Sequence, residues 1–479
     1  MTATASLPAY DRSRLTPGIV HIGLGNFHRA HMAVYLDDLF AMGEGMDWAI
    51  IGAGVRAPDA RMRDALKAQD CLSTVIELDP KGKTARRIGA MVDFVEVQPD
   101  NAALIAAMSR PEIRIVSLTV TEGGYYVDPA TGRFDPTHPD IVADARRPDH
   151  PATAFGAILA ALRARRAAGI PPFTVMSCDN LPGNGHVTRA AVAGLARLFD
   201  PALADWVEAE VAFPNGMVDR ITPATGPRER TIAAQFGLAD DPVPVTCEPF
   251  RQWVLEDHFP AGRPPLERVG VTFTPHVHAF EAMKIRILNG GHAIIAYPGG
   301  LLDIEYVHEA MAEPLIAGFL DKVEREEIIP IVPPVPGTDL NDYFTLIRDR
   351  FSNPEVADTE RRLCLDGSNR QPKFIIPSIA DNLARGNLPR GLLLESALWC
   401  RYCMGISDSG KVIEPNDPNW DRLQANARAA ASDPVAWLGM EDIYGDLAQN
   451  RDCLATFAAF LADLGTRGTR AVLSDYLNG

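Results

Sequence analysis

A lysine, an amide and an imidazole lie within nine residues in an otherwise apolar stretch, at Lys284, Asn289 and His292. On a regular helix, at roughly 100° per residue, His292 would lie roughly 80° and Asn289 roughly 140° around from Lys284, so all three would share one broad face. Lysine is scarce, with seven in 479 residues. An unpaired ammonium in an apolar setting is costly, and burial lowers the pKa of a lysine, so Lys284 is a candidate general base.

A second amide, Asn180, follows the strand-like run FTVMS in the segment SCDN. Asn180 and Asn289 could both donate hydrogen bonds to the partly negative oxygen of a reacting alcohol or ketone. Lys284 would then take the hydroxyl proton while hydride leaves carbon for a nicotinamide, and His292 would orient a neighbouring hydroxyl. Taken singly, Asn180 could be a turn residue, Asn289 a helix break and His292 a core histidine. Together, beside a dinucleotide-binding pattern, they favour redox chemistry on an alcohol.

That cofactor pattern lies near the N-terminus, where the run IVHI leads into Gly23-Leu24-Gly25 and then into helical spacing. Glycines at this place allow a tight turn and a close approach of the backbone to a pyrophosphate. The third glycine of G-x-G-x-x-G is missing, because His28 stands there. A plain turn between strand and helix is the competing interpretation.

Two further segments follow strand candidates and could contact the cofactor. Asp59 is the nearest carboxylate after the second strand, where an acidic residue favours NAD over NADP, although Arg56 and Arg61 flank it and it could equally cap a helix. Thr121 and Glu122, in TVTEGGY, follow another strand and could line the ligand-binding edge of a parallel sheet or simply form a turn.

The elements that position these residues alternate between strand and helix over about the first 200 residues. Strands are predicted at 18–23, 48–54, 73–78, 91–95, 113–120 and 173–177, and helices at 26–43, 151–168 and 184–198. From residue 280 onward helical periods dominate, at 280–297, 303–327, 340–350, 355–363, 375–385, 390–404, 420–430, 434–448 and 452–464. We therefore predict an α/β fold, with a Rossmann-type doubly wound sheet over 1–279 and a mostly α-helical domain over 280–479.

Composition narrows the class of protein. A net charge of -16 argues against a nucleic-acid partner, and no run approaches the roughly 18 apolar residues of a membrane span. The N-terminus lacks an apolar signal-peptide core, and seven scattered cysteines fit a reduced, cytoplasmic protein. Cys400 and Cys403 are expected to be neighbours on one helix, and no Cys, His and Glu pattern suggests a catalytic metal.

With these motifs in place, the chain resembles the mannitol 2-dehydrogenase family of polyol-specific long-chain dehydrogenases along nearly its whole length. The resemblance rests on the runs IVHIGLGNFHRAH, SLTVTEGGY, FTVMSCDNLPGNG, FPNGMVDRITP, CEPFRQWVLED, KIRILNGGH and DGSNRQPKF. It implies a zinc-independent enzyme with its active site between a Rossmann-type domain and a helical domain. Two small departures, NGGH for NGSH and LPGNG for LPHNG, concern the substrate pocket.

The resemblance also implies roles for single residues. Lys284 corresponds to the family's base, Asn180 and Asn289 to its oxyanion-holding amides, and His292 to its substrate-orienting histidine. Glu281 corresponds to a glutamate linked to proton exchange, and Asp219 to the aspartate of MVDR. The expected NAD-binding residues are Ile22, Gly23, Gly25, Asn26, Phe27, Arg29, Asp59, Thr121 and Glu122.

The leading hypothesis is an NAD-dependent dehydrogenase that converts D-mannitol to D-fructose, and also D-arabinitol or D-sorbitol. A hexuronate reductase, acting on D-fructuronate and D-mannonate, is the alternative, with Arg370 and Lys373 as cations for a substrate carboxylate; both could equally bind sugar hydroxyls. A catalytically silent sensor is opposed by the intact set of four catalytic candidates. We expect a small polyol or ketose as partner, no nucleic acid, no membrane, and a monomer or weak homo-oligomer.

Overall fold

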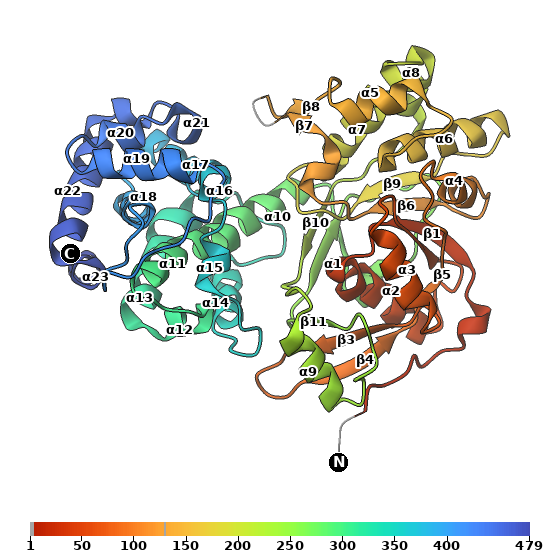
Figure 1. Cartoon of the computed structure of the whole chain (residues 1–479), viewed down its shortest axis with the longest axis horizontal. Helices are drawn as coiled ribbons and strands as arrows, with labels where there is room; N and C mark the ends of the chain where they lie inside the picture. Colours follow the sequence, from red (N-terminus) through yellow and green to blue (C-terminus); the bar gives the residue numbers. More distant parts are fainter. Residues whose placement is uncertain (1–3, 129–130) are drawn as a thin grey trace. The chain divides into compact units, whose positions relative to one another are not determined.

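The computed structural model describes residues 4–128 and 131–479. The chain divides into two compact units, one ending at His278 and the other running Ala279–Gly479. Figure 1 shows that strands are confined to the first unit and that the second is helical. Within the described residues, no helix is both long and apolar enough to cross a membrane.

The first unit is built on a five-stranded parallel sheet in the order β5-β2-β1-β6-β9. The strands are short and apolar because both faces of the sheet are covered. The order reverses between β1 and β6, so the chain crosses from one half of the sheet to the other at that point. This is the arrangement of a Rossmann-type fold, as predicted. The strands are β1 (Pro17–Ile22), β2 (Ala49–Ala53), β5 (Met91–Phe94), β6 (Ile115–Leu118) and β9 (Thr174–Ser177).

Helices pack on both faces of this sheet (Figure 1). Alternate strand residues point to opposite faces, so Ile19 of β1 joins the core beneath α2 and α3, while Val20 joins the core beneath α4, α6 and α7. The helices of this unit are α1 (Asn26–Ala30), α2 (Met32–Ala41), α3 (Asp59–Lys67), α4 (Ala102–Met108), α5 (Pro139–Arg146), α6 (Ala154–Ala167), α7 (Asn184–Arg197), α8 (Pro201–Glu210) and α9 (Pro227–Gln235).

The helix predicted over 26–43 is wrong in one respect, because it breaks at His31 into α1 and α2. His31 has φ -119° and ψ -90°, outside the helical region. Its ring Nε2 makes a 2.8 Å hydrogen bond with the carbonyl of Gln252, which holds the kink against a distant segment. A tertiary contact thus interrupts a segment whose apolar spacing alone is continuous.

Smaller sheets complete the first unit. The predicted strand at 73–78 is real, but it pairs outside the five-stranded sheet, in the order β11-β3-β4, and a second set runs β10-β12-β13. The strands are β3 (Ser73–Glu77), β4 (Thr84–Ile88), β11 (Val245–Cys247), β10 (Gly216–Asp219), β12 (Gln252–Leu255) and β13 (Thr272–Phe273), with a hairpin of β7 (Val127–Asp128) and β8 (Arg133–Phe134).

The second unit consists of helices packed around α11 and α18. Cys400 and Cys403 lie together on α18 as buried thiols, as predicted. The helices are α10 (Val277–Met283, which starts in the first unit), α11 (Gly290–Leu301), α12 (Val307–Ala312), α13 (Pro314–Val323), α14 (Leu340–Phe351), α15 (Glu360–Leu363), α16 (Gly367–Phe374), α17 (Ile376–Ala384), α18 (Arg390–Cys403), α19 (Trp420–Ala430), α20 (Val435–Leu438), α21 (Glu441–Tyr444), α22 (Arg451–Arg467) and α23 (Thr469–Asn478).

The helices of this unit differ from the predictions at several places, and the helix over 355–363 is shortened to Glu360–Leu363. The helix over 303–327 is divided, because Pro314 starts a new helix at α13. The helix over 434–448 is two short ones, separated near Gly439. Helix α16 was not predicted, since Gly367 and Pro372 both disfavour a helix by propensity.

Candidate active site

Lys284 and Asn289 are the first and last residues of a π-helical turn, and not part of a regular α-helix as predicted. The amide of Gly290 donates to the carbonyl of Ile285, five residues earlier. Because a π-helix repeats its hydrogen bonds at i→i+5, residues five apart lie roughly one turn from each other. The spacing of Lys284 and Asn289 matches this repeat, which brings them closer around the axis than the α-helical estimate. Such turns occur often at functional sites.

Two polar atoms next to this turn are buried and have no hydrogen-bond partner among the described residues. They are Oδ1 of Asn289 and Nε2 of His292. The His292 ring stacks on Phe351, with ring centroids 4.3 Å apart, which fixes its plane. Buried polar atoms in folded proteins are nearly always paired, so two unpaired ones in four residues are available to a bound ligand or water molecule.

His292 is a neutral imidazole at neutral pH. Burial lowers its pKa well below the usual value, and the positive charges of Arg362, Arg350, Arg370 and Lys284 lower it further. A neutral ring keeps one nitrogen as donor and the other as acceptor, so it can both accept from and donate to hydroxyl groups.

Three other predicted residues lie on helices at or beside the π-helical turn. Glu281 is 7% exposed on α10, and Lys284 is also 7% exposed. Helix α16, which carries Arg370 and Lys373, packs against the turn. Arg370 Nη1 donates to the carbonyls of Arg362 and Leu363, at 3.3 and 3.1 Å, so it caps the end of α15, whereas Lys373 is exposed.

A buried acid that the sequence did not suggest lies against the same segment. Glu324 begins a second π-helical turn, Glu324–Ile328, which contacts the first. Its side chain is fully buried, and neither carboxyl oxygen has a hydrogen-bond partner among the described residues. A Cβ added to Gly291 would lie 3.3 Å from its Oε1, so the glycine leaves this carboxyl its space. Burial raises the pKa of Glu324 well above its usual value, which keeps the group protonated.

In the first unit, the predicted residues gather at the carboxyl ends of three adjacent strands. Gly23 and Gly25 follow β1, Thr121 and Glu122 follow β6, and Asn180 follows β9. Thr121, Glu122 and Asn180 are exposed. The carboxyl edge beside the reversal of strand order is where open α/β sheets bind ligands.

Gly23 and Gly25 have different surroundings in the turn. Gly23 has φ +96°, and a Cβ there would lie 2.1 Å from the carbonyl oxygen of Thr119. Only glycine fits such a contact between β1 and β6. Gly25 is open, since an added Cβ would meet nothing within 4 Å. The turn is thus in close contact with Thr119 at Gly23 and open at Gly25.

Side chains after the turn hold it in place. Asn26 donates to the Pro223 carbonyl at 3.1 Å and to Thr225 Oγ1 at 2.9 Å. Arg29 is 1% exposed and donates to the carbonyls of Gly25 and Val243. Phe27 stacks on His31 with centroids 4.8 Å apart, and Ile22 is buried in the sheet. These side chains support the turn from within the fold.

The missing third glycine is replaced by a pair of stacked imidazoles. The rings of His21 and His28 lie 3.5 Å apart between centroids. His21 makes hydrogen bonds with Ser117 Oγ at 2.7 Å and Thr119 Oγ1 at 2.9 Å, which joins β1 to β6. Burial lowers the pKa of His21 to about 3, so the pair carries no charge at neutral pH.

Asp59 is the first residue of α3, and its carboxylate reaches back to the loop after β2. Oδ2 accepts from the amides of Val55 at 3.1 Å and Arg56 at 3.0 Å. The Arg56 guanidinium lies 3.6 Å from the other oxygen. The carboxylate therefore holds the loop that follows β2. The two roles suggested for Asp59 from the sequence, selection of NAD and a helix cap, did not include this contact.

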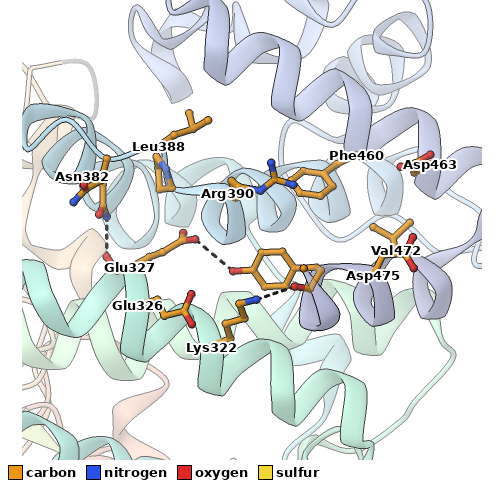
Figure 2. Close-up of a pocket in the computed structure, with 14 residues that line it drawn as sticks. Lys322, Glu326, Glu327, Asn382, Leu388, Arg390, Phe460, Asp463, Val472 and Asp475 are labelled. Atoms are coloured by element: carbon orange, nitrogen blue, oxygen red, sulfur yellow. Dashed lines mark hydrogen bonds between the residues drawn. The ribbon is translucent and has the colours of Figure 1, made fainter.

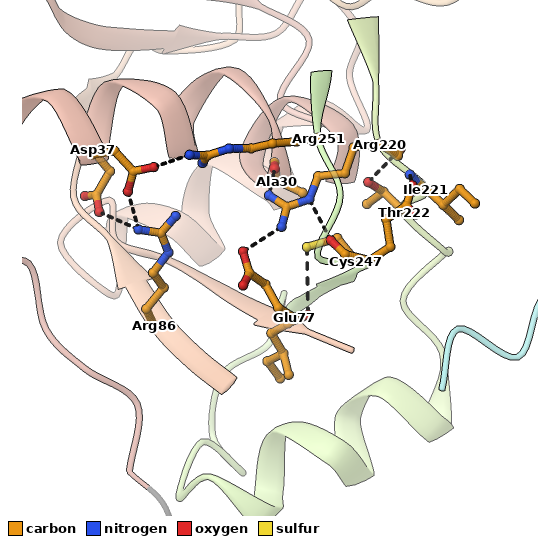
Figure 3. A network of polar contacts seen from close by, with 12 residues as sticks. Ala30, Asp37, Glu77, Arg86, Arg220, Ile221, Thr222, Cys247 and Arg251 are labelled. Atoms are coloured by element: carbon orange, nitrogen blue, oxygen red, sulfur yellow. Dashed lines mark hydrogen bonds and ion pairs between the residues drawn. The ribbon is translucent and has the colours of Figure 1, made fainter. Parts of the chain in front are cut away.

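Asp219 ends β10 and is 5% exposed, beside a buried arginine, Arg220, that reaches the end of α1. Arg220 donates to the carbonyl of Ala30 at 2.6 Å and to Glu77 at 2.7 Å. Figure 3 shows how Arg220 lies between these two residues. Nearby, Arg86 and Arg251 both pair with Asp38. This network fixes the end of α1 to β3, so the MVDR motif supports the helix that follows the glycine turn.

A cavity of about 770 Å³ opens elsewhere in the helical unit, along α18, α22 and α23 (Figure 2). Its lining includes Glu327, whose carboxylate accepts from the amides of Gly391 and Leu392, and Lys322, which donates to the Tyr476 carbonyl. None of the predicted site residues lines it.

The structure therefore places the predicted residues in two sets. Lys284, Asn289, His292, Glu281, Arg370 and Lys373 belong to the helical unit, and the remaining predicted residues belong to the Rossmann-type unit. Glu324 was not predicted, because the acidic run EREE that contains it is typical of a solvated surface. Phe351 was not predicted either. Among residues 4–128 and 131–479, no group of three or more His, Cys, Asp or Glu side chains is arranged to hold a metal ion.

Comparison with known proteins follows this division. Residues 17–268 match the family model of the Mannitol dehydrogenase Rossmann domain, and residues 276–464 match that of the Mannitol dehydrogenase C-terminal domain. The chain is 73% identical over 477 residues to a mannitol 2-dehydrogenase of Cereibacter sphaeroides, with 100% of both chains covered. It is 43% identical to a mannitol 2-dehydrogenase of Aspergillus fumigatus, with 99% of this chain and 96% of the other covered.

Two solved structures share the fold over the full length. A Pseudomonas fluorescens mannitol 2-dehydrogenase, in a ternary complex with NAD and D-mannitol, superposes with a TM-score of 0.87 at 43% identity, covering 99% of this chain and 97% of that one. A D-sorbitol dehydrogenase in substrate-free form gives a TM-score of 0.91 at 35% identity, covering 98% of each chain. On the match of both family domains and these full-length relatives, the chain belongs to the mannitol dehydrogenase family.

Proposed function

We propose that this protein is an NAD-dependent, metal-independent oxidoreductase that oxidises D-mannitol at C2 to D-fructose, and also accepts D-arabinitol or D-sorbitol. The observation that carries the proposal is the π-helical turn with Lys284 and Asn289 at its ends and two unpartnered polar atoms beside it. The names of the relatives, which are mannitol 2-dehydrogenases at 73% and 43% identity, agree with it.

The Rossmann-type unit offers a site that fits NAD. The open backbone at Gly25 leaves room for a pyrophosphate, and Gly23, Asn26 and Arg29 keep the turn in shape. Thr121 and Glu122 lie exposed on the neighbouring strand end. The negative charge of Asp59 after β2 disfavours the 2′-phosphate of NADP. When bound, NAD would accept the hydride from C2.

Lys284 is proposed to act as the general base, taking the proton of the C2 hydroxyl at Nζ. The amides of Asn180 and Asn289 would hold the same oxygen as it gains negative charge. The neutral His292 would exchange hydrogen bonds with a neighbouring hydroxyl through its unpartnered Nε2. Glu281, three residues before the base on α10, would pass the proton onward to solvent. Asp219, Arg370 and Lys373 are proposed to lie near the sugar hydroxyls.

An initial-rate panel tests this proposal. D-mannitol, D-arabinitol, D-sorbitol and D-mannonate would each be offered with NAD⁺ and with NADP⁺, and NADH or NADPH formation followed by absorbance. We expect the highest kcat/KM with D-mannitol and NAD⁺. Turnover of D-mannonate with none of D-mannitol would instead identify a hexuronate reductase and overturn the assignment.

A further inference from the structure

A buried carboxylate joins two strand ends of the Rossmann-type unit. Asp179 directly precedes Asn180 at the end of β9 and is 9% exposed. Its Oδ2 accepts from the amide of Val120 at 2.9 Å, and its Oδ1 accepts from the amide of Thr121 at 3.0 Å. Both donors belong to the loop after β6. One carboxylate therefore ties the loop of Thr121 and Glu122 to the strand end that carries Asn180.

A tyrosine and a serine complete the same joint. The hydroxyl of Tyr125 donates to Asp179 Oδ2 at 2.6 Å and lies 2.6 Å from Ser177 Oγ. Tyr125 and Ser177 are both fully buried. Asp179 thus receives three donors, and two of them are backbone amides whose direction is fixed by the chain. Such charge-assisted bonds in a dry setting are strong and set geometry closely.

The loop held by Asp179 has a backbone that it would not adopt by itself. Thr121 has φ +66°, a region that β-branched residues rarely occupy. Backbone strain of this kind persists only where surrounding contacts enforce it, and it gathers at functional sites. The amide of Thr121 is one of the two that donate to Asp179. The bond and the strained residue thus belong to one arrangement.

We propose that Asp179 is a positioning residue for the reaction, which sets the loop of Thr121 and Glu122 and the amide of Asn180 in one fixed arrangement. The inference rests on the proposed function, in which that loop contacts NAD and Asn180 holds the reacting oxygen. Loss of the carboxylate releases the loop, which weakens cofactor binding, and lets the Asn180 backbone shift, which lowers the chemical rate.

The test compares Asp179→Asn with a matched control, Asp144→Asn. Asp144 is 2% exposed in the same unit and accepts from the amides of Ala152 and Thr153 and from Thr153 Oγ1. It therefore makes the same kind of joint, in segments that carry none of the predicted site residues. Stability by thermal melting, the Kd of NADH by fluorescence titration, and kcat with D-mannitol would be measured for both.

We expect both variants to lose stability. Only Asp179→Asn should also lower kcat on the order of tenfold or more and raise the Kd of NADH several-fold, because small displacements of catalytic groups are costly. A variant of Asp179 with wild-type kcat and Kd would overturn the proposal. If Asp179→Asn does not fold, Tyr125→Phe decides, since it removes one donor; a fall in kcat with weaker NADH binding supports the proposal, and unchanged values overturn it.

The two readouts also separate this inference from the proposed function. The NADH titration involves no polyol, so it reports on Asp179 even if D-mannitol is not a substrate. Failure of the substrate panel with weaker NADH binding in Asp179→Asn would leave the positioning role intact. If the wild type turns over D-mannitol and Asp179→Asn keeps the wild-type kcat and Kd of NADH, the proposed function stands and the positioning role of Asp179 is refuted.

Discussion

Polar side chains at the carboxyl edge of the sheet and at the π-helical turn of the second unit differ in how their hydrogen bonds are satisfied. At the sheet edge, Asn26, Arg29 and Asp179 are engaged with backbone atoms of neighbouring loops. Beside the turn, Asn289, His292 and Glu324 each keep a buried polar atom without a hydrogen-bond partner among the described residues. In the first region these three side chains hold the shape of the turn and loops, and the exception is His28, whose two ring nitrogens have no hydrogen-bond partner among the described residues. The second keeps polar groups available, at a cost in stability, which is the pattern expected where substrate is bound.

The largest expected effect comes from removing the proposed base. Lys284→Ala should lower kcat for D-mannitol oxidation by about 10²- to 10⁴-fold, the range typical of general-base catalysis. Stopped assays by absorbance at high enzyme concentration would measure the residual rate. Arg286→Ala is the matched control. Arg286 belongs to the same turn and donates to Asp381, and this variant should retain most activity. Equal losses in both variants would break the assignment of the base.

Asn289→Ala should follow, with kcat lower by about 10²- to 10³-fold, the usual cost of losing one donor to a developing oxyanion. The KM for the polyol should change much less, because the contact strengthens as charge develops on the oxygen. Steady-state kinetics over a range of D-mannitol concentrations checks this split. A higher KM with wild-type kcat would mean that Asn289 only binds ground-state substrate.

The open side of the glycine turn gives the next effect. Gly25→Val adds a side chain whose Cβ would meet nothing within 4 Å beyond its chain neighbours, so stability should change by less than about 0.5 kcal/mol. NADH binding should weaken by about tenfold or more, because the backbone can no longer approach the pyrophosphate. Gly465→Val on α22, where an added Cβ also meets nothing within 4 Å, is the control. Unchanged NADH affinity in Gly25→Val would place the cofactor elsewhere.

The smallest effect concerns the buried acid beside the turn. Burial raises the pKa of Glu324, so above the ordinary glutamate pKa of 4.5 the unfolded chain loses this proton while the folded protein keeps it. Stability therefore falls as pH rises, by about 1.4 kcal/mol per unit of pKa shift. Glu324→Gln removes this contribution.

Relative to wild type, Glu324→Gln should gain stability progressively as the pH rises above 4.5, in thermal or denaturant unfolding. Glu326→Gln, an exposed neighbour in the same turn, should run parallel to wild type. Glu360, with a raised pKa, and Glu395, with a pKa of about 8, leave some pH dependence in every variant. Parallel curves for Glu324→Gln and wild type would refute the protonated acid.

The sequence predicted the Rossmann-type region better than the helical one for a physical reason. Strands buried on both faces are continuous apolar runs, so β1, β2, β6 and β9 could be located within about two residues. The two glycines mark the turn, because only glycine allows the backbone at Gly23. The break at His31 and the pairing of β3 outside the main sheet depend on contacts with distant segments, which no local pattern contains.

In the helical unit, the residue types at 284, 289 and 292 indicated chemistry, but their geometry was wrong. A π-helical turn has no signature in a 3.6-residue period, so the sequence suggested a regular helix. Glu324 was hidden for a related reason: within EREE only some side chains point inward, and tertiary packing decides which. Candidate residues for a site could thus be predicted from sequence, while the spatial relation among them required the fold.

The Rossmann-type unit is proposed to bind the cofactor, and the π-helical turn is proposed to carry the catalytic base. NADH titration of Lys284→Ala beside Gly25→Val tests this separation of roles most directly. Lys284→Ala should bind NADH with the Kd of the wild type although its turnover is lost. Gly25→Val should bind NADH at least about tenfold more weakly while its stability is kept. A large loss of NADH affinity in Lys284→Ala, together with wild-type affinity in Gly25→Val, would contradict the account.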